Sequence, residues 1–318
     1  QSRRSVCRWA LKPLKMNSLS TSNDVQDSAL LERCPALAQI TAVIVTFNSA
    51  HCVPDLVQQL QGWPHICVVD NGSADDTVQQ VRQQLPQAKV IALPQNMGFG
   101  FANNRGFEAA TTPFCLMINP DCGLQSAHAQ QLWEVAQQWP DAAIVVPQLV
   151  ESNGKAQLNY GWIRHWWAAK GPGAEGVACV ANACGAAMLL RLANQPTGGW
   201  FDERFFLYYE DEDMCLRLLQ ERKPVVIEPA ARVPHSNRGS VRGPRPLKVE
   251  YGRGYHHARS KVMFTAKHAG AAAAQKHRLQ SLSGAVALLV LRVLAPSPKH
   301  LSRLWGRICG LWGAPTRY

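Results

Sequence analysis

The stretch HICVVDNGSADDTVQQVRQQLPQAKVIAL, residues 65–93, contains two short apolar runs separated by a helical pattern. The runs at 65–70 and 89–93 are rich in Val and Ile and have strand length, which is typical of buried strands in a parallel sheet. Between them, Ser73 and Asp76 have the spacing of a capping box, and the apolar residues that follow recur on one helical face. The stretch therefore predicts a β-α-β unit.

The same alternation extends in both directions along the chain. Apolar runs at 42–48 and 114–119 predict two further strands, and residues 125–139 repeat the helical pattern. Alternating strands and helices indicate an α/β fold with a doubly wound sheet, in which ligands bind outside the carboxyl ends of the strands.

Basic residues are concentrated in the C-terminal part of this chain of 318 residues. The formal net charge is +11, and 17 Lys and Arg against two acids lie from Lys223 onward. We expect a disordered basic leader at 1–38, the α/β domain at 39–250 and basic, amphipathic helices at 251–318. Such an excess predicts an anionic partner, either a membrane surface or a phosphorylated substrate. We expect no nucleic-acid partner, because the sequence has no zinc-finger spacing and no RNA-binding signature.

Targeting signals are weak in this sequence. The longest apolar run, 284–295, is interrupted by Arg292 and falls short of the roughly 18 residues that a membrane span needs. The basic N-terminal stretch lacks the apolar centre of a signal peptide, and the ten cysteines are scattered without a Cys-x-x-Cys pair. We therefore expect a cytoplasmic protein with reduced cysteines and no zinc site.

Polar residues follow each predicted strand. The first ends in Thr46-Phe47-Asn48, the second in Asp70-Asn71-Gly72-Ser73, and the fourth in Asn119-Pro120-Asp121. The loop after the third strand, QNMGFGFANNRG, adds Gly98 and Asn103, and its glycines permit close approach of backbone to a ligand. Because the glycine spacing of a dinucleotide-binding loop and the lysine of a phosphate-binding loop are both absent, we expect a different kind of nucleotide site.

Four adjacent acids, Glu210 to Asp213, follow two tyrosines in YYEDEDMCLR, residues 208–217. One interpretation is the polar face of a helix, with Asp213 supporting Arg217 four residues later. The other is a general base, because the aromatic stretch WFDERFF before it disfavours the charged form of a carboxyl group and raises its pKa.

Six motifs in order, VIVTFNS, VVDNGSADDT, NMGFGFANNRG, LMINPD, GAAMLL and FDERFFLYYEDEDMCLRL, resemble the inverting glycosyltransferases of family 2, which have the GT-A fold. The resemblance covers residues 40–240 and is strongest to rhamnosyltransferase-like members that act on bacterial surface polysaccharides and glycolipids. It implies a nucleoside-diphosphate sugar donor, dTDP- or UDP-linked, a divalent metal and transfer with inversion. The implied function is transfer of a rhamnose-like sugar to a hydroxyl of a lipid-linked or glycan acceptor.

The resemblance also implies a role for each strand end. It implies that Asp70 accepts hydrogen bonds from the base or ribose of the donor. The full set of implied substrate-binding residues is Thr46, Asn48, Asp70, Asn71, Gly98, Asn103, Asn119 and Glu210. Metal binding falls to Asp121 and to His235, and the metal is Mg²⁺ or Mn²⁺. The first acid of the family's Asp-x-Asp motif is replaced by Asn119, which weakens the expected metal affinity. Arg238 and Arg242 are either phosphate clamps or solvated loop charges.

The same resemblance makes Asp211 the catalytic base, which takes the proton from the acceptor hydroxyl. We expect Glu212 and Asp213 to face solvent or to pair with Arg217 and other basic groups. The altered metal motif leaves open a non-catalytic protein that only binds sugar nucleotides, and a nucleotidyltransferase is a second alternative.

Residues 300–313 have an amphipathic helical pattern, with apolar Leu301, Leu304, Trp305, Ile308, Leu311 and Trp312 on one side. Together with the basic excess, this pattern predicts peripheral attachment to the anionic inner face of the cell membrane. The alternative is that this helix packs on the catalytic domain.

Overall fold

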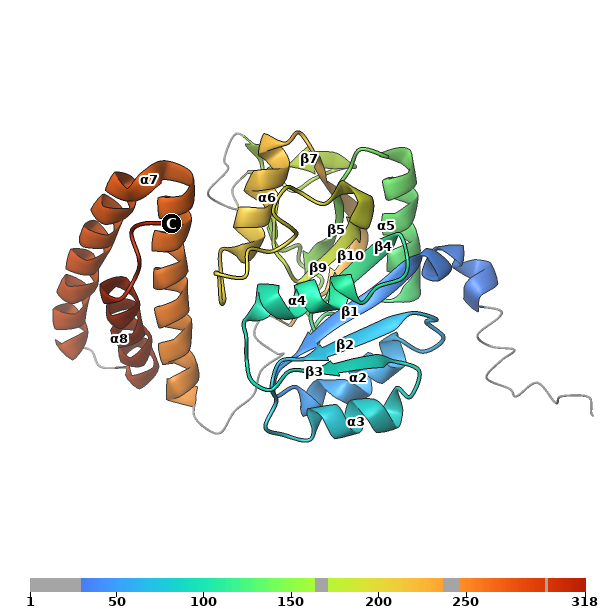
Figure 1. Cartoon of the computed structure of the whole chain (residues 1–318), viewed down its shortest axis with the longest axis horizontal. Helices are drawn as coiled ribbons and strands as arrows, with labels where there is room; N and C mark the ends of the chain where they lie inside the picture. The colour runs from blue at the N-terminus through green and yellow to red at the C-terminus, as the bar shows by residue number, and fades with distance from the viewer. Residues whose placement is uncertain (1–29, 164–170, 237–245, 295–296) are drawn as a thin grey trace, which may run out of the picture.

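The computed structural model describes residues 30–163, 171–236, 246–294 and 297–318. A mixed sheet of eight strands, in the order β3-β2-β1-β4-β9-β5-β10-β7, forms the centre of the first part of the chain (Figure 1). The strands are β1 Ile40–Thr46, β2 Ile66–Asp70, β3 Lys89–Ala92, β4 Phe114–Ile118, β5 Ile144–Val150, β7 Ala178–Val180, β9 Ala187–Arg191 and β10 Val225–Pro234. The short strands β6 Tyr160–Gly161 and β8 Asn182–Ala183 form a separate pair.

Strands β1 to β4 are parallel, so their carboxyl ends lie at one edge of the sheet. Strand β9 runs antiparallel between β4 and β5 and makes the sheet mixed. The predicted strands and the fold class are confirmed. We call the edge formed by the carboxyl ends of β1, β2 and β4 the strand-end rim.

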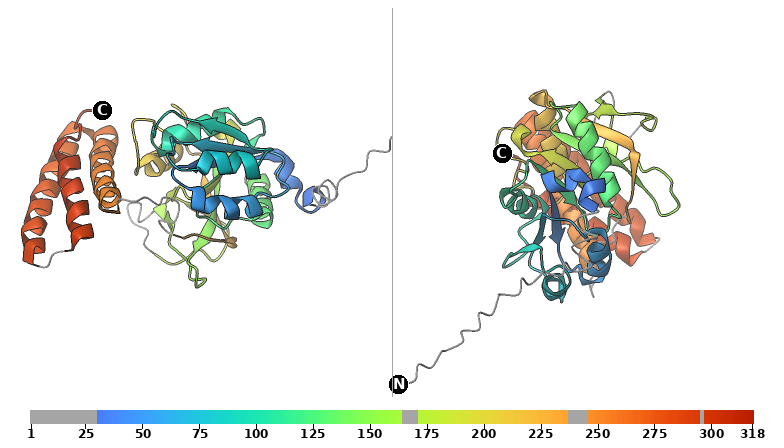
Figure 2. Two further views of the ribbon diagram at one scale, coloured as in Figure 1. Left: turned by 90° about the horizontal axis from the view of Figure 1, so that it is seen from below. Right: turned by 90° about the vertical axis from the view of Figure 1, so that its right-hand side faces the viewer.

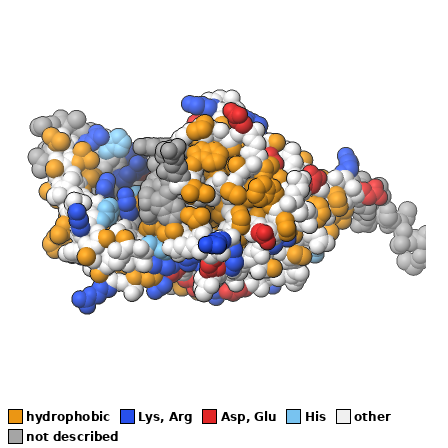
Figure 3. Space-filling view, turned by 90° about the horizontal axis from the view of Figure 1, so that it is seen from above, with side chains coloured by type: hydrophobic (Ala, Val, Ile, Leu, Met, Phe, Trp, Pro, Cys, Tyr) orange, Lys and Arg blue, Asp and Glu red, His pale blue; other side chains and the backbone are white. Residues whose placement is uncertain are grey.

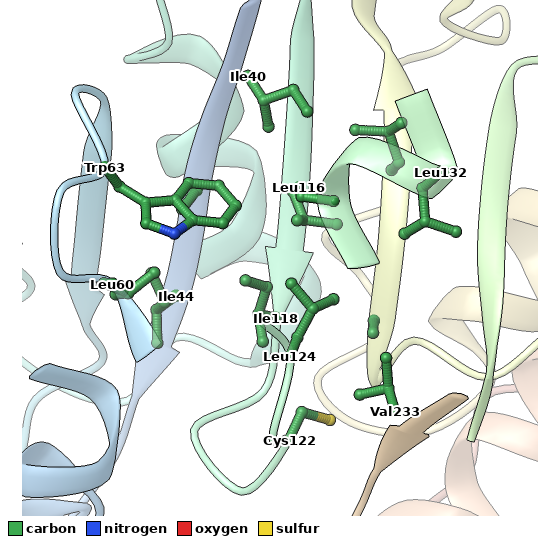
Figure 4. Packing of buried hydrophobic residues seen from close by; sticks show 14 of the residues in the cluster. Ile40, Ile44, Leu60, Trp63, Leu116, Ile118, Cys122, Leu124, Leu132 and Val233 are labelled. Carbon is green, nitrogen blue, oxygen red and sulfur yellow. The ribbon is translucent and has the colours of Figure 1, made fainter. Parts of the chain in front are cut away.

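Helices cover both faces of the sheet. One face carries α2 Val53–Gln59, α3 Thr77–Gln84 and α5 Ser126–Gln138; the other carries α4 Phe99–Glu108 and α6 Glu210–Gln220. Alternate strand residues point to opposite faces, so Ile44 and Leu116 pack with Leu132 of α5, whereas Val43 packs beneath α4. Figure 4 shows the first of these two cores, including the fully buried Trp63.

Packed structure begins ahead of the boundary that we predicted at residue 39. Leu30 packs against the first core, and the 3₁₀-helix η1, Pro35–Gln39, buries Ala36 and Leu37 completely. Residues 30–38 are therefore part of the folded domain, because apolar side chains in this segment pack against the first core. The rest of the predicted leader lies outside the described residues.

Helices α7, Pro246–Leu294, and α8, Pro298–Trp312, follow the domain, and we call them together the helical hairpin. Helix α7 turns back on itself near its middle, so that its two arms and α8 pack together (Figures 1 and 2). Helix α7 is interrupted by Gly270, and α8 packs along it. A Cβ atom on Gly306 would lie 2.0 Å from the carbonyl oxygen of Tyr251, and one on Gly310 would lie 2.2 Å from that of Tyr255. Glycine is therefore required where the two backbones approach so closely.

The structure divides the predicted apolar side of α8 into two faces. Leu304, Ile308 and Leu311 pack against α7, whereas Trp305 and Trp312 are 54% and 77% exposed. Packing on the protein is thus the correct interpretation for the leucine face, although the partner is α7 rather than the catalytic domain. The two tryptophans remain available to an external surface. Among the described residues, no helix has the length and apolar character needed to cross a bilayer.

Candidate active site

The β2–α3 turn is built around Asp70. The Oδ1 atom of Asp70 accepts hydrogen bonds from the Thr46 hydroxyl at 2.9 Å and the Ser73 hydroxyl at 2.5 Å, and its Oδ2 atom accepts one from the Ser73 amide at 2.9 Å. The side-chain oxygen of Asn48 accepts a hydrogen bond from the Ala74 amide in the same turn. Since Thr46 and Asp70 are almost fully buried, they position the strand-end rim, and direct contact with a ligand stays a prediction.

The loop before α4 is fixed by Asn71. Its Nδ2 group donates to the carbonyl oxygen of Gly98 at 3.0 Å, and its Oδ1 atom accepts from the Met97 amide at 2.8 Å. Gly98 has φ of 102°, and an added Cβ would lie 2.7 Å from the carbonyl oxygen of Phe206. This loop therefore sits directly against the segment that leads into α6, and only glycine fits there.

Asn103 lies on α4 rather than at the rim. Its side chain is fully buried and donates to the carbonyl oxygen of Phe99 at 3.0 Å. The sequence placed Asn103 with the substrate-binding residues because the loop was expected to extend further. In the structure α4 begins at Phe99, and Asn103 lies on the buried face of that helix.

A cavity of about 500 Å³ lies over the strand-end rim. Of the predicted site residues it brings together Asn71, Asn119, Glu210 and Asp211. Apolar walls come from Phe47, Phe99 and Phe206, and α7 contributes Val249, Arg253 and His256. A larger cavity of about 710 Å³, beside the Trp200 loop, contains none of the predicted site residues.

Asp211 is oriented at the start of α6. The Gly185 amide donates to its Oδ2 atom at 2.9 Å, and the Glu212 amide donates to its Oδ1 atom at 3.1 Å. Before the helix, Tyr208 and Tyr209 both have left-handed backbone conformations, with φ of 68° and 69°. Such conformations are strained for residues with large side chains and persist only where surrounding contacts impose them. We call these two residues the tyrosine turn.

The two glutamates on either side of Asp211 have raised pKa values. Burial and the neighbouring Asp211 raise the pKa of Glu210 well above its ordinary value. Burial and the same neighbour raise the pKa of Glu212 to about 10. The shifts favour the protonated form of both groups, which reduces repulsion within the cluster. A charged acid such as Asp213 is favourable in the first turn of α6, because the helix N-terminus carries partial positive charge.

Asp213 does not face solvent. It is fully buried and accepts hydrogen bonds from Arg217 at 2.9 Å and from His268 at 2.7 Å, while the Lys267 ammonium lies 2.6 Å from its Oδ1 atom. The pairing with Arg217 is as expected, and the two α7 partners are new. Burial alone would raise the pKa of Asp213, but His268, Lys267 and Arg217 lower it below its ordinary value. Asp213 thus joins α6 to the helical hairpin.

Asp121 and His235 come together at the ends of β4 and β10. The Asp121 Oδ1 and His235 Nε2 atoms are 3.7 Å apart, and the Cys122 sulfur lies within 4.8 Å of both groups. Burial lowers the pKa of the His235 imidazole, although Asp121 opposes this effect. One carboxylate oxygen and one neutral imidazole nitrogen at this spacing fit a single divalent ion, and the mixed N and O donors favour Mn²⁺ over Mg²⁺. Arg238 and Arg242 lie outside the described residues.

The hairpin side of the site was not predicted from the sequence. His256 stacks on Phe206 with ring centroids 4.5 Å apart, and the Ser260 hydroxyl donates to the carbonyl oxygen of Leu207 at 2.9 Å. His257 packs edge-on against both residues of the tyrosine turn. The only sequence signal was the polar cluster GRGYHHARS at 252–260, which interrupts an otherwise ordinary helical pattern.

The fold and the polar strand-end rim define a nucleotide-sugar transferase of the GT-A type. The family model "Glycosyl transferase family 2" matches residues 41–194, and this match together with the fold identifies the chain as a glycosyltransferase, an enzyme. It is 25% identical over 240 residues to an N-acetylglucosaminyl-diphospho-decaprenol L-rhamnosyltransferase of Mycobacterium tuberculosis, a match that covers 64% of this chain and 76% of the relative. It is 28% identical over 227 residues to a pre-mycofactocin glycosyltransferase of the same species, covering 69% of this chain and 47% of the relative.

Two solved structures have the same fold. The mannosyltransferase PcManGT from Pyrobaculum calidifontis, in complex with GDP-Man and Mn²⁺, matches with a TM-score of 0.51 at 13% identity and covers 92% of this chain and 96% of its own. GalNAc-T7 with UDP, GalNAc and Mn²⁺ matches with a TM-score of 0.50 at 14% identity, covering 72% of this chain and 51% of its own.

Proposed function

We propose that this glycosyltransferase moves a sugar with inversion, and that Asp211 removes the proton from the acceptor hydroxyl. The observation that carries this proposal is the position of Asp211 on the wall of the rim cavity, where the Gly185 amide fixes one of its carboxylate oxygens. An alcohol is a weak nucleophile at neutral pH, so a positioned base speeds its attack on the anomeric carbon. The raised pKa of Glu210 beside it favours the protonated carboxyl group, which could donate a hydrogen bond to an acceptor oxygen.

The donor side of the site would be formed by Asn71, Asn119 and the rim loops. Asp121 and His235 would bind the divalent metal, which when bound stabilises negative charge on the departing diphosphate. Asn119 lines the cavity two residues before Asp121, and in this proposal it would contact the donor sugar or diphosphate.

Relatives guide the choice of substrates. A rhamnose-like sugar on a dTDP or UDP carrier and a lipid-linked or glycan acceptor fit the rhamnosyltransferase relative, whose name specifies an acceptor with a diphosphate-linked lipid. We place the reaction in bacterial cell-surface glycan synthesis, on the cytoplasmic side of the membrane. The alternatives, a non-catalytic sugar-nucleotide-binding protein and a nucleotidyltransferase, predict no turnover and pyrophosphate release respectively.

A donor screen tests the proposed function. Incubation of the protein and Mn²⁺ with UDP- and dTDP-sugars, including the rhamnose donor, should slowly release free nucleoside diphosphate through hydrolysis, without an added acceptor. Chelation should abolish the release. Release of pyrophosphate, or no release with every donor, would contradict the glycosyltransferase proposal.

The metal assignment has a separate test that does not depend on turnover. Asp121→Ala should weaken Mn²⁺-dependent binding of UDP or dTDP by about tenfold or more, because a charge-assisted contact to the metal is lost, and should leave binding of the corresponding nucleoside nearly unchanged. Titration calorimetry with and without Mn²⁺ measures both. Equal affinity of wild type for the diphosphate in the two conditions would rule out a metal bridge through Asp121.

Attachment to an anionic membrane would use the exposed tryptophans of α8. Trp305 and Trp312 are seven residues apart, on the same helical face, and the surrounding arginines would add roughly 1 kcal/mol each near anionic lipid, a contribution that salt screens. Trp305→Glu with Trp312→Glu should release the protein from phosphatidylglycerol vesicles in a cosedimentation assay. Leu279→Glu, at an exposed position on α7, is the matched control. Equal pelleting of wild type and the double variant would rule out attachment through this face.

A further inference from the structure

A second cavity, of about 440 Å³, opens between α7 and α8 beside the rim cavity. Four arginines line it: Arg253, Arg292, Arg303 and Arg307. We call it the arginine pocket. Its remaining walls include Tyr208, His257 and two leucines, Leu288 and Leu304. On the face seen in Figure 3, Lys, Arg and His side chains gather over the helical hairpin, whereas Asp and Glu side chains are seen over the rest of the molecule.

The positive charge of the arginine pocket is only partly neutralised. Glu250, which is buried between the helices, forms ion pairs with Arg253 and Arg303. Arg292 and Arg307 form no ion pair with any residue that the structure describes. Like charges in one pocket repel each other, and an anion bound between them would relieve this repulsion. Guanidinium groups suit phosphate in particular, because they donate two parallel hydrogen bonds to it.

The arginine pocket adjoins the rim cavity. Tyr208 and Arg253 line both cavities. The ring centroid of His257, on the pocket wall, lies 5.5 Å from that of Tyr208 and 5.4 Å from that of Tyr209. The tyrosine turn leads directly into Glu210 and Asp211. An anion in the pocket would therefore lie on the side of Asp211 where the hairpin, rather than the strand-end rim, forms the wall.

Apolar side chains lie beside the arginines. Leu288 and Leu304 line the pocket, and Leu288 and Leu291 are 42% and 63% exposed on α7. A ligand that contacts both kinds of side chain would combine a phosphate group with an apolar chain.

From this arrangement we propose that the arginine pocket binds the phosphate or diphosphate group of an amphiphilic acceptor, and so places the acceptor hydroxyl at Asp211. The proposal rests on the glycosyltransferase function proposed above, and it assigns acceptor binding to the helical hairpin. The donor diphosphate, by contrast, is assigned to the metal pair at the strand-end rim.

Inorganic pyrophosphate in EDTA is the probe, since the donor site then lacks its metal. Arg292→Gln with Arg307→Gln should weaken pyrophosphate binding at least tenfold in titration calorimetry, because two phosphate-binding groups are removed. Arg82→Gln, an exposed arginine on α3, is the matched control and should bind like wild type. Asp121→Ala should also bind pyrophosphate like wild type, because the metal site does not contribute to this binding.

The outcomes separate this proposal from the proposed function. Intact Mn²⁺-dependent UDP or dTDP binding in the arginine double variant, with loss of pyrophosphate binding, supports the arginine pocket. If wild type and the double variant bind pyrophosphate equally, the pocket proposal is wrong even though the donor site stands. If the double variant loses only its binding to phosphatidylglycerol vesicles, the arginines contact the bilayer surface and the acceptor assignment is overturned.

Discussion

Asp211→Asn should lower the turnover number of sugar transfer by about 10²-fold or more while changing donor affinity little. The amide has nearly the same shape as the carboxylate, and its oxygen can still accept the hydrogen bond from Gly185. It cannot take a proton from the acceptor. Steady-state kinetics with a saturating donor, together with nucleotide binding by calorimetry, would separate the loss of a base from the loss of substrate binding.

Glu212 offers a matched control in the same helical turn. Because burial and Asp211 raise its pKa to about 10, Glu212 is protonated at neutral pH, and Glu212→Gln removes no negative charge there. We expect this variant to retain most of the wild-type turnover. Comparable losses in the two variants, or substantial activity of Asp211→Asn, would transfer the role of base to another group.

The catalytic domain could be predicted from local sequence patterns. Buried parallel strands form continuous apolar runs, and the polar residues that follow them must meet at one edge, so 42–48 and 65–70 were sufficient to locate the strand-end rim. The sequence could not predict that Thr46 and Asp70 would hold the β2–α3 turn by hydrogen bonds. Whether a polar side chain at a strand end contacts a ligand or supports a turn depends on hydrogen bonds to Ser73, and sequence spacing does not reveal them.

The hairpin contribution could not be predicted because it depends on long-range docking. Arg253 and His256 reach the rim cavity only because α7 packs against the loop that precedes α6. Periodicity shows that α8 is apolar on one side, but it does not show that Leu304 faces α7 while Trp305 faces outward. A distinction of this kind requires the partner helix.

A buried contact of that docking is centred on Asp213, which binds residues of both α6 and α7. Its carboxylate has no exposure and binds Arg217, Lys267 and His268. Removing it leaves the mostly buried Arg217 without its ion-pair partner, whereas Lys267 keeps its ion pair with Asp202. Breaking a buried ion pair by deleting one partner costs about 3 to 5 kcal/mol. That is a large fraction of the roughly 5 to 15 kcal/mol by which domains are stable.

Asp213→Ala should therefore lower the free energy of unfolding by about 3 to 5 kcal/mol, measured by urea denaturation at neutral pH. Because His268, Lys267 and Arg217 lower the folded-state pKa of Asp213 below its ordinary value of 3.8, this stabilisation is complete above that value. It is lost as the pH falls through the folded-state pKa. The difference between wild type and variant should consequently be constant from pH 5 to neutrality and should shrink in stronger acid.

Asp55→Ala, at an exposed position on α2, is the control and should change stability by less than about 0.5 kcal/mol. If Asp213→Ala fails to fold, Asp213→Asn keeps the hydrogen-bonding shape and should show a smaller loss in the same direction. A loss below about 1 kcal/mol in Asp213→Ala would mean that the buried charges contribute little net stability, as some buried ion pairs do. In that case the docking of the hairpin onto α6 would rest on the aromatic contacts of Phe206 and Tyr209 with α7.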